Sequence, residues 1–157
     1  MSITVIDYGS GNLKSVAKAL ELAANNINVN SKIVVTSDPK IIKQSDKIVL
    51  PGQGSFRDCY LGIKKIPGLD ETLNEFVLEK KKPILGICVG MQLFAKTGYE
   101  SQETKGFGWI DAEVRKINTI NKKLKLPHMG WNEIEFKFIL LAAASSALAA
   151  DFKLPEP

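Results

Sequence analysis

The chain has 157 residues, enough for one domain with its own core, and its 45% apolar and 24% charged residues are typical of globular proteins. The net charge of +4 and the pI near 9.0 are only mildly basic, and the short lysine runs lack interleaved aromatic residues, which argues against nucleic-acid binding. No uncharged stretch is longer than residues 138–150, which are too few to span a bilayer, so no membrane association is expected.

Short apolar runs alternate with segments in which apolar residues recur at helical spacing. The apolar runs predict strands at residues 2–6, 32–36, 47–50 and 83–87. The first run ends in the tight turn 7–12, and Pro51 and Gly52 stop the third. Helices are predicted at residues 13–24 and from residue 69 to about 82, and another opens at residues 91–94.

Strands that are almost wholly apolar and alternate with helices indicate an α/β fold, an open, mostly parallel, twisted sheet covered by helices on both faces. Residues 109–117 and 131–137 read as β segments without an intervening helix, which predicts an antiparallel extension at one edge. No repeat or linker divides the chain, so residues 1–137 are expected to form one domain.

The last twenty residues, 138–157, differ in composition from the rest. Residues 142–150 contain as many alanines as residues 1–137, six in each case. One interpretation is a small buried helix. The other is that this segment is not the natural continuation of the domain but results from a truncation or frameshift, which would leave the fold incomplete at its C-terminus.

The segment Gly86-Ile87-Cys88-Val89-Gly90 lies between a predicted strand and a predicted helix. This is the glycine–x–nucleophile–x–glycine elbow, with cysteine as the nucleophile. We expect the two glycines to be required because the sharp turn leaves no room for Cβ atoms. The turn places the sulfur at the carboxyl edge of the sheet, where helix N-terminal amides favour the thiolate. The Val89 N–H is then positioned to stabilise an oxyanion. The alternative is a buried structural cysteine.

The second glycine-rich turn, Pro51-Gly52-Gln53-Gly54-Ser55-Phe56, allows two interpretations. It is either a plain strand-to-helix turn, with Ser55 or a neighbour capping the helix, or a second source of oxyanion-binding amides. A third turn, at residues 9–12, begins with G-x-G but has Lys14 at the third glycine position, so a dinucleotide site is rejected. No cofactor and no metal are expected.

The chain has two cysteines and no secretory start, which favours free thiols in a cytoplasmic protein. Cys59 lies in a helical stretch after Phe56 and has no glycine elbow. We therefore expect Cys59 to be a small core or surface residue and Cys88 to carry the chemistry.

Four motifs give a specific resemblance over about residues 2–137: residues 6–13 (IDYGSGNL), 50–56 (LPGQGSF), 85–93 (LGICVGMQL) and 127–132 (PHMGWN). In order and spacing they resemble the glutaminase subunits of imidazole glycerol phosphate synthase, which are class I glutamine amidotransferases of histidine biosynthesis.

The resemblance implies roles for particular residues. Cys88 matches the nucleophile that attacks the carboxamide of glutamine and forms a glutamyl thioester, releasing ammonia before hydrolysis to glutamate. Val89 and the Gly52-Gln53 peptide match the oxyanion hole. Gln92 and Glu100 match positions that hold the substrate, with Glu100 beside its α-ammonium group; the alternative for Glu100 is an ordinary surface acid.

The resemblance also implies a partner, a cyclase subunit that is a (β/α)₈ barrel and uses the ammonia to make imidazole glycerol phosphate. Five residues fall in segments that face this subunit: Tyr8, Asn12, His128, Met129 and Trp131. Stimulation of the glutaminase by the cyclase's ligand is expected as well.

One part of the family pattern is missing. Thiol attack needs a base, which the family supplies as histidine and glutamate in a C-terminal H-x-E segment. The single histidine, His128, lies in the partner-facing motif, and Leu154 stands two residues before Glu156. We therefore expect little glutaminase activity from this polypeptide alone. Two alternatives stay open: a non-catalytic partner-binding protein, and a paralogue that supplies ammonia for the biosynthesis of cell-surface sugars.

Overall fold

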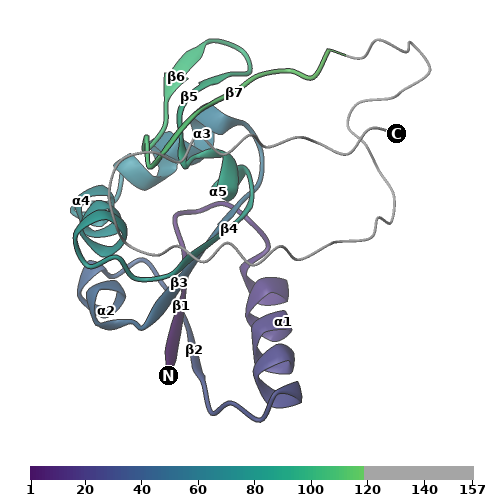
Figure 1. The fold of residues 1–157 in the computed structure, drawn as a ribbon, viewed down its shortest axis with the longest axis vertical. Coiled ribbons are helices and arrows are strands. Elements are labelled where there is room, and N and C mark those ends of the chain that lie inside the picture. The colour runs from purple at the N-terminus through teal and green to yellow at the C-terminus, as the bar shows by residue number, and fades with distance from the viewer. Residues whose placement is uncertain (119–157) are drawn as a thin grey trace. The chain divides into compact units, whose positions relative to one another are not determined.

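The computed structural model describes residues 1–118, in which strands and helices alternate along the chain. Its main sheet has four parallel strands in the order β2-β1-β3-β4 (Figure 1). Their bounds are β1 Ser2–Ile6, β2 Lys32–Thr36, β3 Lys47–Gly52 and β4 Ile84–Cys88. The predicted parallel sheet is confirmed. Its strands are almost wholly apolar because both faces of a parallel sheet are covered by helices.

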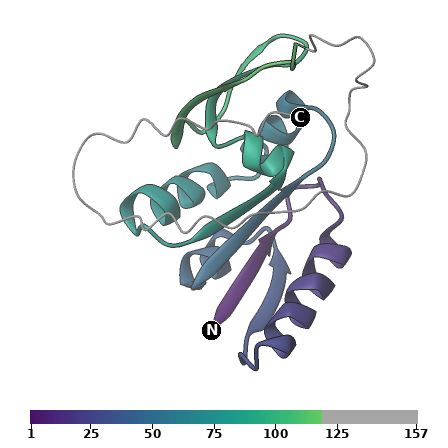
Figure 2. The same cartoon turned by 45° about the vertical axis from the view of Figure 1, so that its right-hand side comes forward.

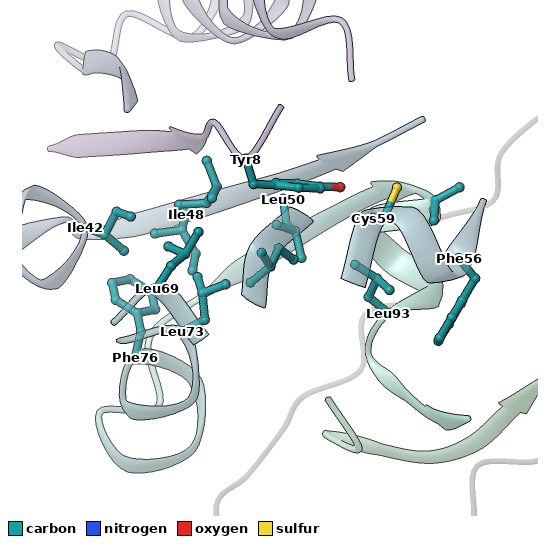
Figure 3. Packing of buried hydrophobic residues seen from close by; sticks show 13 residues of the cluster. Tyr8, Ile42, Ile48, Leu50, Phe56, Cys59, Leu69, Leu73, Phe76 and Leu93 are labelled. Carbon is teal, nitrogen blue, oxygen red and sulfur yellow. The ribbon is translucent and has the colours of Figure 1, made fainter. Parts of the chain in front are cut away.

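Helices cover both faces of this sheet (Figure 2). Their bounds are α1 Leu13–Asn26, α2 Pro39–Gln44, α3 Phe56–Lys64, α4 Leu69–Asn74, the π-helical turn η1 Glu75–Glu79, and α5 Val89–Gln92. Alternate residues of β3 point to opposite faces, as the strand period of two requires. Val49 packs in the cluster that α1 covers, whereas Ile48 and Leu50 pack in the larger cluster beneath α2, α3 and α4 (Figure 3).

A second sheet follows α5 and has three strands in the order β6-β5-β7. Its strands are β5 Ala95–Tyr99, β6 Glu103–Lys105 and β7 Ile110–Val114. The β5–β6 pair is antiparallel and the β5–β7 pair is parallel. Within residues 1–118 the antiparallel pairing thus lies in a separate small sheet, and the main sheet is parallel throughout. The predicted segment 131–137 and the tail 138–157 lie outside the described residues.

Aromatic side chains attach the second sheet to the helices. Trp109 stacks on Phe107 with ring centroids 4.2 Å apart and lies 5.1 Å from the Phe94 ring. The indole Nε1 of Trp109 donates to Asn74 Oδ1 of α4 at 2.8 Å. The rings contribute buried apolar area, and the hydrogen bond fixes the orientation of the indole.

Two boundaries differ from the sequence-based expectation. β3 does not stop at Pro51 but continues to Gly52. From Leu50 onward β3 pairs only with β4, so Pro51 lies where one edge of the strand is open, a position that tolerates proline. The helix expected to reach residue 82 instead changes to a π turn, closed by the Lys80 N–H and the Glu75 carbonyl at 2.9 Å, and ends at Glu79.

Helix α2 was not expected from apolar spacing, because six residues are too few to show a period. The sequence features that indicate this helix are the capping residues at its N-terminus. Asp38 is the N-cap and its Oδ1 accepts from the Lys40 N–H at 2.8 Å, while Pro39 occupies the first turn. No helix in the part of the chain that the structure describes has the length and apolar character needed to cross a membrane.

Glu75 links α2 to the π turn. Its carboxylate lies 2.7 Å from Lys43 Nζ and 2.9 Å from Lys80 Nζ. Hydrogen bonds from these two ammonium groups lower the pKa of Glu75 from 4.5 to about 2. Because the folded-state pKa is depressed, the stabilisation is fully present above pH 4.5 and is lost as the pH falls towards 2.

We therefore expect Glu75→Gln to lower the melting temperature at pH 7, with the deficit shrinking between pH 4.5 and pH 2. Thermal unfolding of both proteins across this range, followed by circular dichroism, measures the difference. Glu79→Gln is the matched control, since residues 1–118 supply no ion pair to Glu79. A Glu75→Gln deficit independent of pH would contradict the assignment.

Candidate active site

Cys88 occupies a sharp turn between β4 and α5. It is the last residue of the strand and the N-cap of the helix, with φ 55° and ψ −122°. A positive φ is unusual for a residue with a Cβ atom and costs on the order of 1–3 kcal/mol, so surrounding contacts must hold it. The residue is exposed, as a nucleophile at the carboxyl edge of a parallel sheet should be.

The flanking glycines allow backbone segments to approach the turn directly. A Cβ atom at Gly90 would lie 2.8 Å from the Leu50 carbonyl carbon and closer still to its oxygen. One at Gly86 would lie 2.7 Å from the Met91 nitrogen. These separations are shorter than real Cβ atoms adopt, and the atoms they meet belong to the backbone. The expectation that the elbow leaves no room for Cβ atoms is confirmed.

Helix α5 is shorter than the sequence suggested. It has four residues and begins at Val89, not at Met91. A single turn sums few peptide dipoles, so any stabilisation of negative charge at Cys88 depends on the nearby amides and not on a long helix dipole. Val89 is buried directly after Cys88, and Gln92 is half-buried at the other end of the same turn.

The second glycine-rich turn touches this elbow. Gly52 is the register partner of Cys88, and a Cβ atom on it would lie 2.9 Å from the Val89 carbonyl carbon. The Gln53 N–H, however, donates to Ser10 Oγ at 2.9 Å, and the Ser10 hydroxyl donates to the Gln53 carbonyl at 2.7 Å. In this structure Ser10 therefore holds the amide expected to bind an oxyanion. Ser10 was not expected at the site.

The helix-capping interpretation of that turn is confirmed as well. Ser55 Oγ accepts from the Asp58 N–H at 3.0 Å at the start of α3. Glu100, which follows β5, reaches the same helix end, where its Oε2 accepts from the Phe56 N–H at 2.8 Å. The exposed Glu100 carboxylate thus lies beside the second turn, and a carboxylate is favourable at a helix N-terminus.

The residues expected to face a partner have different environments. Tyr8 is buried, with 5% of its surface exposed, because its ring packs in the core and its hydroxyl donates to the Pro51 carbonyl at 2.5 Å. Its side chain is therefore not part of an exposed face. Asn12 is exposed and caps α1, its Oδ1 accepting from the Ser15 N–H at 3.2 Å. Three further residues lie outside the described residues: His128, Met129 and Trp131.

The two thiols occupy opposite environments. Cys59 is 1% exposed, donates to the Gln53 carbonyl at 3.4 Å and lies 3.4 Å from Ser10 Oγ. It is a core residue, as expected. A surface cavity of about 630 Å³ lies between the 8–11 turn and α3, but Cys88 is not among its lining residues. Within residues 1–118 no cluster of histidine, cysteine or acidic side chains could hold a metal ion.

Comparisons with known proteins give a consistent result. Residues 4–136 match the family described as glutamine amidotransferase class-I. The chain is similar to proteins named imidazole glycerol phosphate synthase subunit HisH. It is 55% identical to that of Pelagibacter ubique over 135 residues (85% of this chain, 63% of the relative). It is 50% identical to that of Bradyrhizobium diazoefficiens (86% and 62%) and 46% identical to that of Brucella suis (87% and 63%). The chain thus spans just under two thirds of these curated relatives.

The close approach of backbone at the elbow predicts that a side chain at Gly90 lowers the stability of the protein. Gly90→Ala should cost about 2–4 kcal/mol of unfolding free energy, because the new methyl group meets the Leu50 backbone. Gly68→Ala is the control: its φ is positive, unlike that of Gly90, but its nearest neighbour would lie 3.9 Å away, so only backbone strain of about 1 kcal/mol is expected. Urea unfolding measures both. Equal costs would mean that the close approach is not what requires Gly90.

Thiol accessibility gives an independent measurement. Iodoacetamide should modify Cys88 at least roughly ten times faster than Cys59 in the folded protein, because Cys59 becomes accessible only through opening of the core. Mass spectrometry of the two cysteine peptides gives both rates, and in concentrated urea, which unfolds the core, the rates should converge. Equal rates in the folded protein would contradict the burial of Cys59.

Proposed function

This chain belongs to the class-I glutamine amidotransferases, and on that premise we propose that it is the glutaminase subunit of an imidazole glycerol phosphate synthase. The observation that carries the proposal is the position of Cys88: an exposed thiol at positive φ, on a turn whose flanking glycines touch neighbouring backbone. Similarity to proteins named as HisH subunits of that synthase supports the choice of pathway.

The proposed reaction is hydrolysis of the glutamine side-chain amide. The Cys88 sulfur adds to the carboxamide carbon and the carbonyl oxygen takes the negative charge. The proton lost by the thiol is delivered to the amide nitrogen, and the intermediate collapses to a thioester as the C–N bond breaks and ammonia leaves. Water then adds to the thioester and releases glutamate and the free thiol. Residues 1–118 contain no histidine, so they do not supply an imidazole base for these proton transfers.

In this proposal the Val89 N–H donates to the developing oxyanion, because it directly follows the nucleophile at the start of α5. The peptide between Gly52 and Gln53 lies against the same turn. Its N–H would have to leave Ser10 Oγ, 2.9 Å away, before donating to the same oxygen. The proposed oxyanion site therefore has one donor fixed by the elbow and a second that is engaged elsewhere in this structure.

Substrate recognition is assigned to two side chains that follow the nucleophile in the sequence, those of Gln92 and Glu100. Gln92 ends the single turn of α5, and Glu100 extends from the end of β5 to the start of α3. We assign the Glu100 carboxylate to the α-ammonium group of glutamine, because an ion pair of this kind distinguishes a free amino acid from a glutamine side chain within a protein.

The proposed partner is a cyclase subunit with a (β/α)₈ barrel, which receives the ammonia. The exposed Asn12, at the start of α1, is placed on the face that meets this partner. His128, Met129 and Trp131, outside the described residues, are assigned to the same face. A cytoplasmic location follows from this metabolic role.

A glutamine-shaped electrophile tests the proposal directly. The diazoketone analogue of L-glutamine should label Cys88 and leave Cys59 unlabelled, and L-glutamine but not D-glutamine should protect Cys88. Peptide mass spectrometry identifies the labelled residue. Labelling that is indifferent to L-glutamine would reject a glutamine site at this thiol.

The same assay tests Glu100. Glu100→Gln should raise the L-glutamine concentration needed for half-protection by about tenfold, because it removes one charge-assisted hydrogen bond worth roughly 1.5 kcal/mol. Glu103→Gln, an exposed acid on β6, is the matched control and should leave that concentration unchanged. Equal effects of the two substitutions would remove Glu100 from the substrate site.

A further inference from the structure

Tyr8 connects the first turn of the chain to the backbone beside Cys88. It follows β1, and its ring lies over Leu50 with the hydroxyl directed towards Cys59 (Figure 3). The ring also meets α3 at Gly62, where a Cβ atom would lie 3.1 Å from Tyr8 Cδ2. The ring is buried, and this packing restricts where its hydroxyl can point.

That hydroxyl donates to the Pro51 carbonyl at 2.5 Å. The carbonyl belongs to the peptide that joins Pro51 to Gly52, and Gly52 is the register partner of Cys88. The hydroxyl oxygen is also 3.0 Å from the position that a Cβ atom on Gly52 would take. Tyr8 therefore lies behind the short piece of backbone that contacts the elbow.

The phenol is a permanent donor. Burial raises the pKa of Tyr8 well above its usual range, and the charges of Cys59 and Cys88 raise it further. The hydroxyl therefore stays protonated throughout the pH range in which a thiol titrates.

We infer that Tyr8 is a positioning residue for the Cys88 thiol. By donating from its buried hydroxyl to the Pro51 carbonyl, it fixes the end of β3 against the Gly86–Gly90 turn. Without this donor the buried carbonyl loses its partner, and the end of β3 shifts to find another. The elbow then loses part of the contact that holds Cys88 at positive φ. The inference rests on the proposed nucleophilic role of Cys88.

The test is Tyr8→Phe in the full 157-residue chain, with iodoacetamide as the probe and the alkylation rate of Cys88 measured as a function of pH. The variant should react roughly three- to tenfold more slowly at pH 7, with its pH–rate profile displaced to higher pH, because a relaxed turn presents fewer amides to the thiolate. Tyr99→Phe, which removes a hydroxyl from the second sheet, is the matched control and should keep the wild-type profile.

Cys59 serves as an internal measure of folding in each sample, because it must stay protected if the core is intact. A Tyr8→Phe profile identical to wild type, with Cys59 protected, overturns the inference and leaves the proposed function untouched. A wild-type Cys88 that reacts no faster than a free thiol in urea counts instead against the proposed nucleophile.

If the small cavity left by phenylalanine prevents folding, 4-fluorophenylalanine at position 8 replaces it. The fluorine fills most of the space of the hydroxyl but donates no hydrogen bond. This protein must show the same fall in rate and the same displacement of the profile. Wild-type behaviour of the fluorinated chain would show that the space filled by the hydroxyl, and not its hydrogen bond, is what matters.

Discussion

The site depends on one contact between two pieces of backbone, the elbow around Cys88 and the end of β3. Gly90 approaches the Leu50 carbonyl so closely that no side chain fits between them, and Gly52 meets Val89 from the same strand. Close packing of this kind is rigid, because backbone atoms cannot move aside as side-chain ends can. It holds Cys88 in a conformation that an isolated chain would avoid, and it directs the sulfur outward from the sheet.

The first turn and α3 support that contact from behind. Tyr8 holds the Pro51 carbonyl, while Ser10 and Cys59 hold the Gln53 carbonyl. The carbonyls of Pro51 and Gln53, on either side of the last residue of β3, are thus bound by side chains from other elements. The arrangement separates the two thiols chemically as well: one is a donor inside the core, and the other is exposed at the edge of the sheet.

The sequence predicted those parts of the fold that strong local patterns define. Apolar runs located the strands of the main sheet, and the spacing of Gly86, Cys88 and Gly90 located the elbow. Shorter or longer-range features were not predictable in the same way. Helix α2 is too short for a period, the π turn depends on packing, and the Ser10–Gln53 hydrogen bonds join residues 43 positions apart. The motif that contains Tyr8 was expected to face a partner. A motif does not show which of its side chains are buried, and the side chain of Tyr8 lies in the core.

The second sheet has a consequence for the proposed role of Glu100 in substrate binding. Glu100 follows β5, and the sheet's position depends on Trp109, which lies against Phe107 and bonds to Asn74 of α4. On that proposal, a substitution in the aromatic cluster would weaken recognition of an amino acid while the sulfur keeps its full reactivity. In a Trp131→Phe chain, where Trp109 is the one remaining tryptophan, its fluorescence would report undocking of the small sheet as a local event, before the parallel sheet melts.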